Sequence, residues 1–154
     1  MSKKIPLQHC FAPILKPIAC AYAGLMRLRR KAYGQGVLSS YQPLVPTVSV
    51  GNISWGGTGK TPIVNWILAW AASKNLQAVV LTRGYKASPP CFPFLVQPHS
   101  NPKEAGDEPL MLACKNPAAK VVVDPKRSRA AEYAEKHLQP DLFVLDDGHQ
   151  HLAL

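Results

Sequence analysis

A glycine-rich segment carries the residues with the clearest capacity for chemistry. This segment ends at Gly59, is followed by Lys60 and Thr61, and begins after a β-branched run from Thr47 to Val50, which we expect to form a buried strand. Glycines let the backbone turn with positive φ, so that its N–H groups approach phosphate oxygens. A lysine at this place reaches the β- and γ-phosphates of a nucleotide, and the next hydroxyl ligates Mg²⁺. The order of strand, loop and apolar helix therefore predicts a phosphate-binding loop.

One residue departs from the usual pattern of such loops. Ser54 stands five residues before Gly59, where a strict pattern has glycine. Serine enters the left-handed region only at an energetic cost, so this loop is expected to open somewhat differently. On spacing alone, a glycine-rich turn that binds nothing is the competing interpretation.

Two pairs of adjacent acidic residues are candidates to complete the site. The apolar strand from Leu142 to Leu145 ends in Asp146 and Asp147, where a carboxylate orients Mg²⁺ or a metal-bound water. Asp107 and Glu108 open an apolar helix, and Asp107 has the character of an N-cap. From spacing alone, this second pair is either a helix cap or a source of a general base.

An arginine follows another buried strand, which runs from Ala78 to Thr82. Arg83 is expected at the carboxyl end of this strand, where open α/β sheets bind their ligands. Its guanidinium could clamp a phosphate, because it donates in a planar fork. A surface salt bridge is the alternative for this residue.

The elements that must position these residues alternate along the chain. We expect further strands over Ala119–Val123 and Leu142–Leu145, and helices that start near Lys60, at Asp107 and at Ser128. This alternation predicts an α/β domain with a doubly wound, mainly parallel sheet. The helix after Lys60 is apolar on most sides, so we expect it to be covered on both faces, with its tryptophans in the core. Residues 86–103 are expected to form a long loop or a strand pair.

The charge distribution indicates an anionic partner. The chain has 154 residues and a net charge of +9, and its first acidic residue is Glu104. A chain whose first 103 residues carry basic but no acidic side chains is expected to bind an anionic partner, such as a nucleotide, a nucleic acid or an acidic lipid surface. Basic and aromatic residues do not interleave in the manner of a nucleic-acid-binding module, so we expect no nucleic-acid partner. The four cysteines show no metal-ligand spacing.

Residues 1–33 form a separate N-terminal segment in this interpretation, followed by a kinase-type domain over 34–154. Pro13, Lys16 and Pro17 interrupt the apolar stretch, which is too broken for a membrane span. A basic cluster follows from Arg27 to Lys31, as in helices that lie on an anionic membrane surface. A helix packed on the domain, with a solvated basic end, remains open as the alternative.

Five motifs together resemble the tetraacyldisaccharide 4′-kinase family, the lipid A 4′-kinases of Gram-negative bacteria. In chain order they are Val45-Pro46, Gly51 to Pro62, Arg83-Gly84-Tyr85, Gly106 to Pro109, and Asp146 to His151. Ser54 is the residue that this family carries in its loop. The resemblance implies a P-loop NTPase-like fold and transfer of the γ-phosphoryl group of ATP to the 4′-hydroxyl of a tetraacyldisaccharide 1-phosphate, giving lipid IVA.

The resemblance also assigns roles to individual residues. The catalytic set is Asp107 as the base on the sugar hydroxyl, with Lys60, Glu108 and Asp147. The expected ATP-binding residues are Ser54, Trp55, Gly56, Gly57, Thr58, Gly59, Lys60, Thr61, Arg83, Gln150 and His151. Of these, Arg83 would lie near the phosphates or near the anionic head of the lipid. The expected Mg²⁺ residues are Thr61, Glu108, Asp146 and Asp147.

The resemblance further implies a peripheral protein on the cytoplasmic face of the bacterial inner membrane, with an anionic glycolipid substrate and no obligate protein partner. Family members continue well past the motif at Asp146–His151, whereas this sequence stops at Leu154. We therefore expect a C-terminal lobe to be missing, and weak or absent kinase activity in these 154 residues. The alternatives are a partition- or targeting-type ATPase switch, which usually has a lysine in place of Trp55, and a non-catalytic nucleotide-binding remnant.

Overall fold

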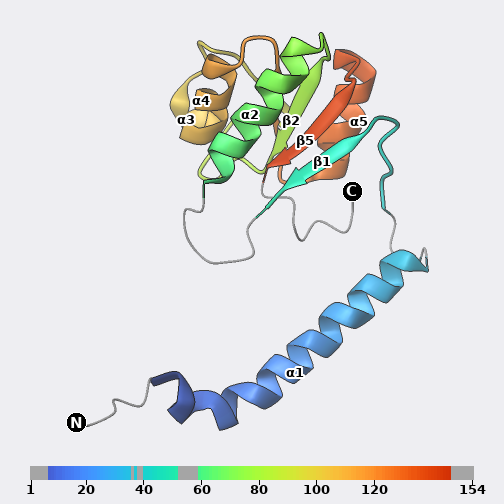
Figure 1. Ribbon diagram of the computed structural model, residues 1–154, viewed down its shortest axis with the longest axis vertical. Coiled ribbons are helices and arrows are strands. Elements are labelled where there is room, and N and C mark those ends of the chain that lie inside the picture. The colour runs from blue at the N-terminus through green and yellow to red at the C-terminus, as the bar shows by residue number, and fades with distance from the viewer. Residues whose placement is uncertain (1–6, 36, 38–39, 52–58, 147–154) are drawn as a thin grey trace. The chain divides into compact units, whose positions relative to one another are not determined.

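The computed structural model describes residues 7–35, 37, 40–51 and 59–146 of the chain (Figure 1). Contacts divide the chain into two compact units, Met1–Ser40 and Tyr41–Leu154. The boundary predicted from the sequence, between residues 33 and 34, lies close to the end of the first helix, α1 (Leu7–Gly34).

The first unit consists mainly of this helix. Its described apolar side chains Ile18, Tyr22, Leu25 and Leu28 are all exposed. The guanidinium of Arg29 lies 5.8 Å from the ring centroid of Tyr33, one turn further along the same helix. Within the described ranges, no helix combines the length and the apolar character that crossing a membrane requires.

The second unit is built on a five-stranded sheet. Its strands are β1 (Thr47–Val50), β2 (Ala78–Thr82), β3 (Phe94–Val96), β4 (Lys120–Val123) and β5 (Leu142–Asp146). Their order across the sheet is β1-β5-β2-β4-β3, with every neighbouring pair parallel except β3 and β4. The predicted doubly wound, mainly parallel sheet is therefore confirmed. The stretch from 86 to 103 contributes one short strand rather than a pair, followed by the short helix α3 (Pro102–Ala105).

Helices cover both faces of this sheet (Figure 1). They are α2 (Lys60–Ser73), α4 (Asp107–Lys115) and α5 (Arg127–Leu138). Alternate strand residues separate into two apolar clusters, because successive side chains of a strand point to opposite faces. One cluster joins Val80 and Val144 to α2 and α4, and the other joins Leu81 and Phe143 to α5. The carboxyl ends of the parallel strands thus lie beside the N-termini of the helices.

Two expectations about burial are wrong. The strand β1 lies at an edge of the described sheet, and only Val50 of its four residues is buried. In α2, Trp66 and Trp70 are 69% and 45% exposed, so they are not core residues. Only the stripe of α2 that contains Val64 and Leu68 is buried, because among the described residues this helix packs on the sheet from one side.

A carboxylate of α5 fastens the segment that leads into β1. Glu135 accepts hydrogen bonds from the Tyr41 hydroxyl and, at 2.7 Å, from the backbone N–H of Leu44. The hydrogen bond to Glu135, together with burial and the negative charges of Glu135 and Glu132, raises the pKa of Tyr41 to about 12. The folded state therefore holds the phenol proton more tightly than the unfolded chain, in which the pKa is near 10.0.

This raised pKa makes the contribution of Tyr41 to stability depend on pH. The contribution is complete below the unfolded pKa and is lost as pH rises through the folded value. We expect the Tm of the wild type to exceed that of Tyr41→Phe at pH ~9, and the difference to shrink towards pH ~12. Thermal melts of both proteins across this range measure the difference, and a Tm gap independent of pH would rule out the linkage.

Candidate active site

A cavity of about 660 Å³ opens at the carboxyl ends of the parallel strands. Its lining includes Thr82 and Asp146 from the ends of β2 and β5, and residues from the first turns of α2, α4 and α5. Crevices at this edge of an α/β sheet bind ligands because strand ends and helix N-termini meet there. Five residues predicted from the sequence line this single cavity: Lys60, Arg83, Asp107, Glu108 and Asp146.

The start of α2 places Lys60 and Thr61 beside α4. Gly59, at the N-cap of α2, adopts the left-handed conformation with φ +75°, which suits glycine. The hydroxyl of Thr61 donates a hydrogen bond to Oε1 of Glu108 at 2.7 Å. This contact joins positions 47 residues apart in the sequence, so two predicted metal ligands are direct neighbours.

The start of α4 differs in one respect from the expectation. Gly106, with φ +83°, is the N-cap, and Asp107 is the first residue of the helix rather than its cap. The left-handed φ explains this, because glycine adopts it without the cost that aspartate incurs. Asp107 and Glu108 are exposed in the first turn, where the partial positive charge of the helix stabilises carboxylates. Neither carboxylate therefore serves as a buried helix cap.

The end of β5 is held by an arginine that the sequence interpretation did not consider. Arg127 is only 2% exposed, and its Nη2 donates to the carbonyl oxygen of Asp146 at 2.8 Å. Its Nη1 lies 3.4 Å from the carbonyl oxygen of Asp124, at the end of β4. Arg127 thus joins the ends of β4 and β5, which lie on either side of β2. It also lines the cavity and brings a buried positive charge to it.

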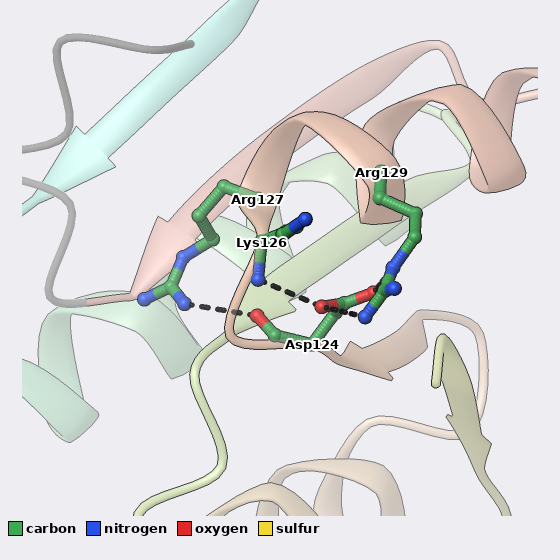
Figure 2. Close-up of polar contacts among 4 residues, drawn as sticks. All are labelled: Asp124, Lys126, Arg127 and Arg129. Carbon is green, nitrogen blue, oxygen red and sulfur yellow. Dashed lines mark hydrogen bonds and ion pairs between the residues drawn. The ribbon is translucent and has the colours of Figure 1, made fainter. Parts of the chain in front are cut away.

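An ion pair between Asp124 and Arg129 holds the backbone next to Arg127 in place (Figure 2). Asp124 is fully buried, and its carboxylate accepts Nε and Nη2 of Arg129 at 2.7 and 2.9 Å. The backbone N–H of Lys126 donates to the same carboxylate at 2.7 Å. The hydrogen bond to Asp124 raises the pKa of Arg129 above its already high value. This bidentate pair fixes the turn that leads into α5 and so fixes the position of Arg127.

Several predicted site residues lie outside the described part of the chain. They are Ser54, Trp55, Gly56, Gly57, Thr58, Asp147, Gln150 and His151. Among the described residues, no group of three or more His, Cys, Asp or Glu side chains could hold a metal ion. This finding is compatible with Mg²⁺, which commonly takes one or two carboxylates and completes its shell with water and substrate phosphates.

The residues that sequence reasoning missed are Arg127, Asp124 and two lysines of the cavity, Lys86 and Lys103. A usable signal for Arg127 was present. The rule that placed Arg83 after β2 also applies to the residues after β4, where α5 begins at Arg127. The two lysines carried no such signal, because they lie in the stretch of 86–103 whose fold the sequence left open.

Comparisons with known proteins identify the family to which this chain is similar. Residues 11–154 match the family model described as tetraacyldisaccharide-1-P 4′-kinase. Curated relatives named tetraacyldisaccharide 4′-kinase include one from Oleidesulfovibrio alaskensis, 58% identical over 97% of this chain. Another, from Nitratidesulfovibrio vulgaris, is 53% identical over 96% of this chain. The chain spans 42% of the length of each of these two relatives.

A solved structure shows the same fold. It is described as the "apo" form of LpxK from Aquifex aeolicus in complex with ATP, and it aligns with a TM-score of 0.72 and 32% sequence identity. The alignment covers 92% of this chain and 45% of that one. Because the family model matches almost the whole sequence and the fold agrees, this chain belongs to the tetraacyldisaccharide-1-P 4′-kinase family.

Proposed function

We propose that this chain binds ATP and carries the phosphoryl-transfer site of a tetraacyldisaccharide 4′-kinase. The observation that carries the proposal is the convergence of Lys60, Asp107, Glu108 and Asp146 on one cavity at the carboxyl ends of the strands. Phosphoryl transfer requires positive charge beside the phosphates. It also requires carboxylates that act on the acceptor hydroxyl and bind the metal. The relatives' names and the ATP complex of the solved neighbour support the same reaction.

The proposed reaction moves one phosphoryl group. The bond from the γ-phosphorus to the bridging oxygen of ADP breaks, and a bond from the 4′-oxygen of the disaccharide to that phosphorus forms. Asp107 accepts the proton of the 4′-hydroxyl, and Lys60 balances negative charge on the β- and γ-phosphates. Arg127 holds the end of β5 and adds a fixed positive charge to the cavity. Such a reaction depends mainly on positioning and on charge neutralisation.

Mg²⁺ fits the donor atoms at the start of α2 and α4. The Thr61 hydroxyl and the Glu108 carboxylate are in contact, and both present the hard oxygen ligands that Mg²⁺ prefers. Thr61, Glu108 and Asp146 would hold the ion, with Asp147 as a further ligand outside the described residues. When bound, it would neutralise charge on the phosphate oxygens of ATP.

A transfer assay tests the proposed function directly. ATP labelled in its γ-phosphate is incubated with the chain, Mg²⁺ and tetraacyldisaccharide 1-phosphate in detergent micelles. Little label is expected in the lipid, because we expect at most weak kinase activity in these 154 residues, and an acceptor that lacks the 4′-hydroxyl should remain unlabelled. Release of labelled phosphate without any labelled lipid would favour a switch-type ATPase instead.

The N-terminal helix supports a membrane-surface location. At about 100° per residue, Ile18, Tyr22 and Leu25 fall on one face of α1. Lys16, Arg27, Arg30 and Lys31 fall on the opposite face, whereas Arg29 falls on the apolar face, where its guanidinium lies over the ring of Tyr33. A helix with one apolar and one basic face binds in the plane of an anionic bilayer surface. We therefore propose a peripheral location on an anionic membrane surface, which the family resemblance assigns to the cytoplasmic face of the bacterial inner membrane.

Binding of the protein to phospholipid vesicles tests this proposed location. Replacing Arg27, Arg30 and Lys31 with Gln is expected to weaken binding to phosphatidylglycerol-containing vesicles by about 100-fold, at roughly 1 kcal/mol for each cation. The matched control replaces three exposed lysines of the second unit, Lys74, Lys115 and Lys136, with Gln. Equal losses for both triple variants would show attraction by net charge alone and would remove α1 as the anchor.

A further inference from the structure

The cavity carries more positive charge than the nucleotide site accounts for. Three cations besides Lys60 and Arg127 line it, namely Arg83, Lys86 and Lys103, which we name the basic wall. All three are exposed, and within the described ranges none of their side chains forms an ion pair with an acidic residue. The cavity lining holds five cations against the three carboxylates of Asp107, Glu108 and Asp146, so it keeps a net positive charge, which attracts an anion.

The backbone holds the basic wall in a defined conformation. Gly84 has φ +68°, and a Cβ there would lie 2.2 Å from Cγ1 of Val123, so this turn after β2 requires glycine. Lys86 has φ +61°, a conformation that costs a non-glycine residue roughly 1 kcal/mol. The N–H of Ser88 donates to the carbonyl oxygen of Lys103 at 2.9 Å, which joins the turn to α3. Strain of this kind is typical of ligand sites.

The N-terminus of α4 contacts both the start of α2 and the turn that follows β2. Glu108 contacts Thr61 of α2, whereas Gly106 lies against the turn, where an added Cβ would be 3.4 Å from the carbonyl oxygen of Tyr85. Asp107 stands between these two positions in the sequence. In-line transfer places the attacking oxygen and the leaving ADP oxygen on opposite sides of the phosphorus. An acceptor that reaches Asp107 from the side of the turn therefore meets the basic wall.

We propose that the basic wall binds the phosphate that the acceptor already carries, the 1-phosphate of the disaccharide named in the family description. This inference rests on the proposed function and deepens it by assigning residues to substrate specificity. A phosphomonoester carries a charge of about −1.5 to −2 at pH 7. Lys86 and Lys103 supply point charges, and Arg83 supplies a planar fork that can donate two hydrogen bonds to phosphate.

The test compares two acceptors that differ only in this group. Tetraacyldisaccharide 1-phosphate and its 1-dephospho form, each in nonionic detergent micelles, are titrated into the chain, and a fluorescent ATP analogue is titrated separately. The variants are Lys86→Met with Lys103→Met, the matching pair of Lys→Arg changes, and Lys115→Met as the control. Lys115 is an exposed lysine in the last turn of α4.

The wild type and the control are expected to bind the 1-phosphate acceptor more tightly than the dephospho form. The double Met variant should lose about 100-fold in affinity for the phosphorylated acceptor only, roughly tenfold for each lysine, and the Arg pair should regain most of it. Equal wild-type affinity for both acceptors, or a preference kept by the double Met variant, overturns the inference. An equal loss of affinity for the ATP analogue would assign the lysines to the nucleotide and also overturn it.

Failure of the proposed function has a different signature. It appears as an affinity for the ATP analogue that does not change when Lys60 is replaced. The basic wall can therefore be wrong while the nucleotide site is right, and the two results are read from separate titrations.

Discussion

Replacing Asp107 with Asn is expected to slow phosphoryl transfer by about 10²–10⁴-fold and to leave the affinity for ATP almost unchanged. Asn keeps the size and polarity of the side chain but cannot accept the proton of the attacking hydroxyl. Asp107 is exposed at the start of α4 and lines the cavity with Lys60, so its replacement removes no buried contact. The loss should therefore appear in the chemical step and not in folding.

Single-turnover kinetics measure this effect, with the chain in excess over γ-labelled ATP so that slow transfer is recorded. The control is Glu132→Gln, which removes a carboxylate from an exposed position on α5 away from the cavity lining. A variant that transfers at the wild-type rate would exclude Asp107 as the base. A parallel fall in ATP affinity would instead assign its carboxylate to nucleotide binding.

Replacing Lys60 with Ala is expected to lower the affinity for ATP by about 10- to 100-fold, the value of a charge-assisted hydrogen bond to phosphate. Lys60 is the first residue of α2 and lines the cavity, so its ammonium and the N-terminus of the helix act on the same phosphates. The effect should be larger for ATP than for AMP, because the lysine serves the β- and γ-phosphates.

Lys74 provides the matched control for this prediction. It is an exposed lysine at the C-cap of the same helix, so Lys74→Ala removes an equal charge from the opposite end. Calorimetric titration with ATP and with AMP measures both variants. Equal losses for Lys60→Ala and Lys74→Ala would show a general effect of net charge and would contradict a phosphate contact at Lys60.

The sheet could be predicted from the sequence because its central strands are short, continuous apolar runs. The runs at Ala78–Thr82 and Leu142–Leu145 became β2 and β5, which are buried on both faces as parallel strands usually are. The same reasoning failed at β1, since a β-branched composition does not reveal whether a strand lies at an edge. It failed also for Trp66 and Trp70, because burial depends on which elements cover a helix, and local pattern does not contain that information.

The site could be predicted in part, and the missing part has a physical reason. Lys60, Asp107 and Asp146 were found because each follows a strand or opens a helix, so topology alone brings them together. The position of Arg127 after a strand was a usable signal that was overlooked, but its role could not be predicted, because the order of β4, β2 and β5 determines what its guanidinium reaches. The lysines of the basic wall were missed because the fold of residues 86–103 was left open, and the left-handed backbone at Lys86 has no sequence signature.

The most direct test of the central claim is a crystal structure of the chain with Mg²⁺ and a non-hydrolysable ATP analogue. The account predicts the β- and γ-phosphates within hydrogen-bonding distance of the Lys60 ammonium, the metal beside Thr61 and Glu108, and the Asp107 carboxylate facing the γ-phosphate. A triphosphate bound outside the cavity, or an Asp107 carboxylate turned away from the γ-phosphate, would contradict it.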